Sequence, residues 1–201
     1  MTTTTRTADR TADTRTGAPA RRTTPRGRAL CAALAVAGTS LVAAAAPAGA
    51  HEITGPVSGE TRAALAQLRA ATARYHDLDT ALAEGFVQGT ECVSNPDGPG
   101  AMGVHYVDMA RLTTGFETTR PEVLIYEPQE NGRMRLVGVE YVVLDADQDA
   151  STLEQHAFPG GVGFHAPHAG TAPVAYTLHA YVWKHNPAGM FVDYNPRNSC
   201  A

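Results

Sequence analysis

Apolar side chains recur with the spacing of a helix face in the stretch that begins at Ser58. The stripe, set among alanines, consists of Leu65, Leu68, Tyr75, Leu78 and Leu82. Such spacing in a segment of good helix formers predicts helix. We expect a break near His76-Asp77, where the aspartate can cap a second short helix. That helix extends through Ala83 and is stopped by Gly85. A stripe this narrow predicts that both helices pack against another element.

Four later segments have the apolar pattern of strands. They are Met102–Val107, Glu122–Glu127, Arg133–Leu144 and Tyr176–Trp183. Asn131-Gly132 predicts a hairpin turn between the second and the third, and the long, alternating third segment is expected to be the central strand. The segments 92–103, 145–150 and 158–173 are loops by composition. Because no long helix separates the strands, we predict an α+β fold, with an N-terminal helical pair packed on an antiparallel sheet of about four to six strands.

Residues 1–50 have the organisation of a signal peptide. Residues 1–28 carry seven arginines and two aspartates, and Ala29–Ala46 form a largely apolar run. That run has the length of a signal-peptide core, and the small residues that follow it predict cleavage after Ala50. Cleavage there leaves residues 51–201, a length that fits a single domain. We therefore predict a secreted protein with no stable membrane anchor after cleavage.

The cysteines fit an oxidising compartment. The pair Arg21-Arg22 permits twin-arginine export, but the residues after it match that signal poorly, so we favour the general secretory route. Cys31 leaves with the signal peptide on either route. The two remaining cysteines, Cys92 and Cys200, predict a disulfide. The alternative, a two-thiolate metal site, would need further soft ligands, and no CxxC-like cluster supplies them.

The charge of the exported part excludes some classes of partner. Residues 51–201 hold nine basic and 18 acidic side chains, a net charge of −9, together with all eight histidines. Nucleic acid and anionic membrane surfaces would be repelled by such a domain. A cationic ligand, including a metal ion, or an unknown small molecule is compatible with it.

Three ionisable residues interrupt strand segments that are otherwise apolar. They are His105, Glu140 and His179. Two imidazoles and one carboxylate form a suitable ligand set for Zn²⁺, Cu²⁺ or Fe²⁺ with open coordination positions. His168, in the glycine- and proline-rich loop, could contribute a fourth ligand. This metal hypothesis requires the three strands to be neighbours in one sheet and the side chains to share a face, with functional atoms within about 5 Å.

The competing interpretation contains no metal. In it, Glu140 pairs with an arginine such as Arg135 or Arg111, and the histidines are ordinary hydrogen-bonded residues. The protein would then be a secreted module that binds a small molecule or another protein. The sequence does not decide whether a metal site would be catalytic.

Cleavage after Ala50 creates one further candidate. His51 would become the N-terminus, and its amine and imidazole could clamp copper as a histidine brace, although Glu52-Ile53-Thr54-Gly55 does not match proteins that use one. Other enzyme templates find no support, since no GxSxG elbow, P-loop or GxGxxG follows a strand.

Several short motifs resemble a family of small secreted bacterial proteins. They are Ala83–Phe86, Met102–Tyr106 (MGVHY), Pro121–Pro128 (PEVLIYEP), Trp183–Gly189 (WKHNPAG) and the closing Asn195-Pro196 with Cys200. The likeness covers most of residues 70–200. It implies secretion and a shared fold, and it carries no catalytic residue to this chain.

Overall fold

Both predicted helices are present, and side chains cap each of them. The computed structural model describes residues 57–167, 170 and 172–200. Its helical elements are α1 (Gly59–Thr72), the 3₁₀ turn η1 (Ala73–His76), α2 (Leu78–Ala83) and the 3₁₀ turn η2 (Met109–Arg111). The Ser58 side chain accepts a hydrogen bond from the Thr61 amide at the start of α1. The Asp77 carboxylate accepts one from the Asp79 amide at the start of α2, as predicted.

The strands form an antiparallel sheet, which confirms the predicted α+β class. Its members are β1 (Val87–Gln88), β2 (Val93–Ser94), β3 (Ala101–Val107), β4 (Val123–Pro128), β5 (Met134–Leu144) and β8 (Ala175–Ala180). The strand order is β1-β3-β4-β5-β8, and β2 pairs separately with β3. A separate two-stranded sheet joins β6 (Ala157–Phe158) and β7 (Val162–Gly163).

The β4–β5 hairpin follows the predicted turn. Pro128 pairs with Met134, and Gly132 has a φ of 75°, a backbone conformation that glycine adopts without strain. The longest strand, β5, is interior but stands one place from the middle of the sheet, which β4 occupies. A register shift in this pair leaves Val137 as the extra residue of a bulge.

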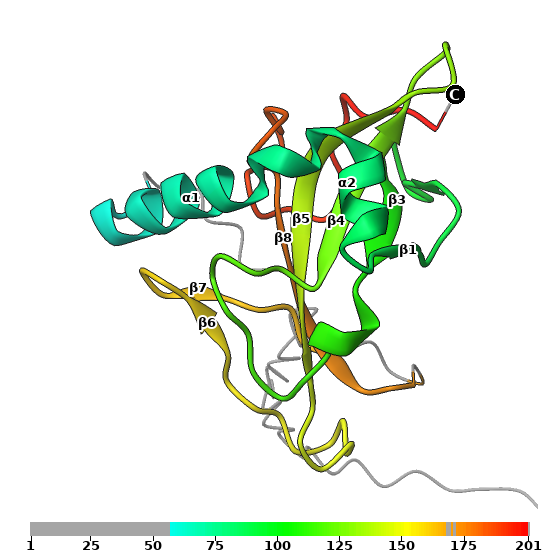
Figure 1. Ribbon diagram of the computed structural model, residues 1–201. Helices are drawn as coiled ribbons and strands as arrows, with labels where there is room; N and C mark the ends of the chain where they lie inside the picture. The colour runs from blue at the N-terminus through cyan, green and yellow to red at the C-terminus, as the bar shows by residue number, and fades with distance from the viewer. Residues whose placement is uncertain (1–56, 168–169, 171, 201) are drawn as a thin grey trace, which may run out of the picture. The chain divides into compact units, whose positions relative to one another are not determined.

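One face of the sheet packs against the helices (Figure 1). Leu68 of α1, Tyr126 of β4 and Val139 of β5 are fully buried in this layer. The Tyr126 hydroxyl also donates a 2.6 Å hydrogen bond to the carbonyl of Tyr75. Burying one leucine side chain stabilises the fold by about 1.5–3 kcal/mol, so the helices contribute much of the core.

The opposite face is covered by the C-terminal segment. A small apolar cluster of Ile125, Val137 and Tyr181 lies there, and each side chain is at most 1% exposed. The Tyr181 hydroxyl donates to the Asp193 carbonyl at 2.7 Å, and the Asn198 side chain donates to the Met102 carbonyl at 2.9 Å. These contacts hold irregular chain over the face of the sheet opposite the described helices.

The main differences from the predicted elements are at strand ends. Strand β8 stops at Ala180, before the predicted end at Trp183, because the Tyr181 amide donates to Met190 and leaves the ladder. Strand β2 and the first residue of β3 fall in a predicted loop. The β6–β7 pair lies largely within the segment that composition marks as irregular.

Some predictions lie outside the described residues. They concern the signal peptide at residues 1–50, the new N-terminus at His51 and the fourth candidate ligand His168. Within the part of the chain that is described, no helix is long and apolar enough to cross a bilayer.

Candidate metal centre

His105, Glu140 and His179 converge on the sheet face that the helices leave uncovered. They come from β3, β5 and β8, and their neighbours in sequence point into the helix-covered core. Glu140 and His179 are direct register partners. One ligand atom from each of the three residues lies within 4.8 Å of the other two. The shared face and the short separation are what the metal hypothesis requires.

One part of the expected arrangement is wrong. Strand β4 lies between β3 and β5, so the strand that carries His105 is not a neighbour of the strand that carries Glu140. His105 pairs with Ile125 of β4, whereas Glu140 pairs with Val123 two residues away. The two side chains therefore meet diagonally across β4. Neighbouring strands lie about 4.8 Å apart, so β3 and β5 are roughly 9.6 Å apart across β4. An imidazole and a glutamate side chain that lean toward each other can span that distance together.

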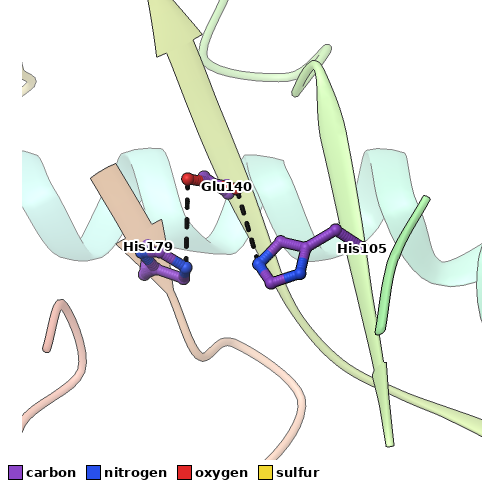
Figure 2. A group of neighbouring side chains, drawn as sticks. All are labelled: His105, Glu140 and His179. Carbon is purple, nitrogen blue, oxygen red and sulfur yellow. Dashed lines mark ion pairs between the residues drawn. The ribbon is translucent and has the colours of Figure 1, made fainter. Parts of the chain in front are cut away.

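The Glu140 carboxylate lies between the two imidazoles (Figure 2). Its Oε2 is 3.6 Å from His105 Nε2, and its Oε1 is 4.0 Å from His179 Nε2. Both separations exceed a normal hydrogen bond. They are near the roughly 3–3.5 Å that separates two atoms bound to one ion at about 2.1 Å. The geometry is therefore compatible with ligands around a shared ion, and the separations are too long for direct hydrogen bonds.

The site is almost closed to solvent. The side chains of His105, Glu140 and His179 are 8%, 12% and 3% exposed. Among the described residues, the ion-pair partners of Glu140 are these two histidines. Arg111 pairs with Asp108 instead, and Arg135 stands opposite Glu127 in the sheet. The arginine pairing of the competing interpretation is therefore not found.

The two histidines differ in their electrostatics. Burial lowers the pKa of His105, and the charge of Glu140 only partly opposes this. Burial alone would also lower the pKa of His179, but the charges of Glu140 and Asp193 outweigh it and raise that pKa. A neutral imidazole is the form that binds a metal. These shifts favour the neutral form at His105 and the protonated form at His179.

Both imidazoles use Nδ1 for a contact away from Glu140. Thr90 Oγ1 lies 3.1 Å from His105 Nδ1 and accepts the His105 amide at 3.1 Å. Asp193 Oδ1 lies 3.1 Å from His179 Nδ1 and 2.8 Å from His165 Nδ1. A proton on each ligand Nδ1 leaves the Nε2 lone pair directed at the centre. Metal-binding histidines commonly have such outer contacts.

Sequence reasoning missed two of these outer residues. Thr90 lies in a short connection and Asp193 in a turn-rich segment, and neither position has a periodic signal. His165 lies in the glycine- and proline-rich loop, three residues before His168, and its backbone pairs with Thr177. Within the described residues, the loop is therefore connected to the site by His165, which contacts Asp193, which in turn contacts His179.

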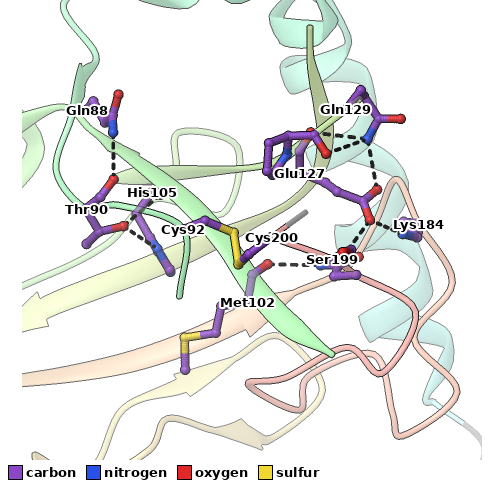
Figure 3. Close-up of a disulfide and its surroundings, with 12 residues drawn as sticks. Gln88, Thr90, Cys92, Met102, His105, Glu127, Gln129, Lys184, Ser199 and Cys200 are labelled. Atoms are coloured by element: carbon purple, nitrogen blue, oxygen red, sulfur yellow. Dashed lines mark hydrogen bonds and ion pairs between the residues drawn. A yellow bond between two sulfur atoms is a disulfide. The ribbon is translucent and has the colours of Figure 1, made fainter. Parts of the chain in front are cut away.

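The predicted disulfide is confirmed beside the same centre. Cys92 and Cys200 are bonded, with 5.6 Å between their Cα atoms and a sequence separation of 108. A two-thiolate metal site is thereby excluded for this pair. Figure 3 shows the bridge next to the segment that carries Thr90, which contacts His105. The bridge thus ties the C-terminus to a segment that orients one candidate ligand.

Comparison with known proteins adds no family. No protein-family model matches the chain, and no curated protein or solved structure matches it either. The resemblance to small secreted bacterial proteins stays a prediction, and any functional conclusion rests on the geometry of the site.

Proposed function

We propose that this is an exported protein that binds one divalent transition-metal ion through His105, Glu140 and His179. The observation that carries the proposal is the orientation of His179. Its Nε2 is buried and makes no hydrogen bond within the described residues, although it faces a carboxylate. A buried polar atom without a partner costs about 1–3 kcal/mol. A metal ion between Nε2 and Glu140 would remove that cost.

The donor set supports Zn²⁺, Cu²⁺ or Fe²⁺. Two imidazole nitrogens and one carboxylate oxygen suit these ions better than Ca²⁺ or Mg²⁺, which prefer oxygen ligands. Three protein ligands leave a coordination position for water or substrate, as in catalytic zinc sites. Such an ion would supply Lewis acidity at a nearly closed centre. We therefore include a catalytic role in the proposal.

Export is supported by two independent features. Residues 1–50 have the composition of a signal peptide, and the Cys92–Cys200 disulfide fits an oxidising compartment. Mass spectrometry of the exported form should find His51 at its N-terminus. A start displaced by one residue would exclude the histidine brace. Replacement of Arg21 and Arg22 by lysine should stop export only if the twin-arginine route is used.

Elemental analysis tests the metal directly. Protein purified from the exported fraction without a histidine tag should carry close to one transition-metal ion per chain. If it carries none, titration with Zn²⁺, Cu²⁺ and Fe²⁺ should restore one. A chain that holds no ion after both measurements would contradict the proposal.

The alternative function is a secreted binding module without a metal. A cavity of about 400 Å³ beside the β6–β7 pair favours it, with His156, Phe164 and Tyr176 among its lining residues. Ligand pockets are typically a few hundred Å³ and lined by aromatic groups. Failure of metal binding together with capture of a small molecule in this cavity would support that alternative.

A further inference from the structure

We infer that Asp193 is a positioning residue of the centre, holding His179 in the tautomer that presents Nε2 to the metal. The inference rests on the proposed metal function and extends it to a residue that touches no reacting atom. Asp193 comes from the irregular C-terminal segment that follows β8, outside the three strands that carry the candidate ligands. The contact between Asp193 and His179 of β8 could not be inferred from the sequence.

The position of Asp193 is fixed by its backbone as well as its side chain. The Tyr181 hydroxyl donates a 2.7 Å hydrogen bond to the Asp193 carbonyl, and Tyr181 itself is 1% exposed. Tyr181 follows His179 by two residues and lies on the same face of the sheet. The same short segment therefore carries the candidate ligand and the hydroxyl that anchors Asp193.

A carboxylate at Nδ1 determines which nitrogen of His179 is available. A neutral imidazole carries one proton, and the other nitrogen holds the lone pair that binds a metal. Asp193 Oδ1, 3.1 Å from Nδ1, favours the proton at that nitrogen. The lone pair is then on Nε2, which faces Glu140 at 4.0 Å. Loss of the negative charge would let the proton occupy either nitrogen.

His165 gives Asp193 a second partner. Its Nδ1 lies 2.8 Å from the same Oδ1 atom, and its backbone pairs with Thr177, two residues before His179. His165 therefore restrains the carboxylate as a second ion-pair partner. We expect His165 to act on the metal only through Asp193, with a smaller effect than Asp193 itself.

An alternative use of the same atoms is a second ion. The buried Nδ1 of His179 and Oδ1 of Asp193 are close, but they are not aligned as a hydrogen bond. His165, Asp193 and His179 Nδ1 could in principle share a cation, with the His179 ring bridging two ions. The number of metal ions bound per chain separates this arrangement from a positioning role.

The test compares Asp193→Asn with a matched control, Asp145→Asn. Asp145 is a carboxylate that is 2% exposed, compared with 26% for the Asp193 side chain, and it accepts a hydrogen bond from Tyr176 on the other face of β8. Zn²⁺ affinity is measured by competition with a chromophoric chelator, and the visible spectrum of the Co²⁺-loaded protein reports ligand geometry. Circular dichroism confirms that each variant is folded.

Loss of an outer contact typically weakens metal binding about 10–100-fold. Asp193→Asn should show that loss and an altered Co²⁺ spectrum, Asp193→Glu should recover part of both, and Asp145→Asn should match the wild type. If Asp193→Asn does not fold, His165→Ala decides through the same readouts. In that case a changed Co²⁺ spectrum with a loss below about tenfold supports the role, and an unchanged spectrum overturns it.

The failures are distinguishable. If the wild type binds one ion and Asp193→Asn binds it equally well with the same spectrum, the positioning role is wrong and the proposed metal function stands. If the wild type binds two ions and Asp193→Asn only one, Asp193 is a ligand of a second site, which also overturns the inference. If the wild type binds no ion, the proposed function fails and the inference fails with it.

Discussion

The two faces of the sheet are both buried, but different means achieve it. On the helix-covered face, Leu124, Tyr126 and Val139 are fully buried under α1 and α2. On the other face, His179 is 2% exposed and His105 6%, beneath irregular chain that the disulfide and side-chain hydrogen bonds hold down. The first face resembles an ordinary core, where stability resides. The second keeps ionisable groups together, which is more typical of a functional site.

The comparison predicts that changes on the two faces separate stability from metal affinity. The largest expected effect is on the helix-covered face. Leu68→Ala removes a fully buried side chain and should lower the free energy of unfolding by about 2–5 kcal/mol. Denaturant titration measures this, and the metal affinity of the folded protein should not change.

Leu82 provides the matched control for that variant. It is a leucine of α2 with 46% exposure, so Leu82→Ala should change the stability by less than about 0.5 kcal/mol. Equal effects of the two substitutions would mean that the helices do not form the core as described.

The disulfide should contribute to stability on the other face. Replacing Cys92 and Cys200 by serine should lower the free energy of unfolding by about 2–4 kcal/mol, because the bridge restricts a long loop of the unfolded chain. Non-reducing peptide mapping of the wild type should recover the two cysteines as one linked pair. Unchanged stability of the double variant would show that the C-terminal segment is held by its hydrogen bonds alone.

The same contrast explains what the sequence could and could not predict. Leu65 and Leu68 lie a helical step apart, and Asn131-Gly132 occupies a turn, so neighbouring residues alone predicted α1 and the hairpin. From the sequence, a shared face for His105, Glu140 and His179 was a requirement of the metal hypothesis, and the structure meets it.

Other features of the site depended on long-range register. The position of β4 between the strands of His105 and Glu140 follows from strand order, which no local pattern encodes. Thr90 and Asp193 reach the histidines through irregular segments with no repeat in their sequence. Such contacts depend on the tertiary fold, so they could not be predicted from composition or spacing.

On the histidine face, the distinguishing effect should be on metal affinity. His179→Ala removes a proposed ligand and should weaken Zn²⁺ binding more than about a hundredfold, since outer contacts alone contribute 10–100-fold. Isothermal titration of the metal-free protein measures the affinity. Stability without metal should also fall, because the substitution leaves a cavity at a side chain that is 2% exposed and removes an ion-pair partner of Glu140 and Asp193. The affinity is therefore compared on protein shown to be folded.

His156→Ala is the control for that measurement. His156 is also a shielded histidine paired with a carboxylate, Glu154 at 2.9 Å, but it is not part of the candidate centre. It should retain wild-type affinity. If both variants lose the metal equally, histidines outside the triad bind it and the assignment to His179 is wrong.

The smallest expected effect compares two buried glutamates. Glu140 has two histidines as ion-pair partners, whereas the Glu122 carboxylate accepts a backbone hydrogen bond from Val142. Burial raises the pKa of Glu122 from 4.5 to about 7 despite that hydrogen bond and the nearby charge of Arg111. Between these two values the folded chain holds a proton that the unfolded chain has lost. Stability must therefore fall as pH rises through this window, by at most about 1.4 kcal/mol per pH unit.

Glu122→Gln should remove that contribution, since an amide does not titrate. Unfolding free energies at pH 5 and pH 6, compared between the wild type and Glu122→Gln, isolate the effect because the other titrating groups are common to both. The wild type should lose about 1 kcal/mol more than the variant over this interval. A parallel pH dependence in the two proteins would show that Glu122 is ionised when folded. Glu122 would then not be a carboxyl group that burial keeps neutral, and its contrast with Glu140, which has histidine partners, would be wrong.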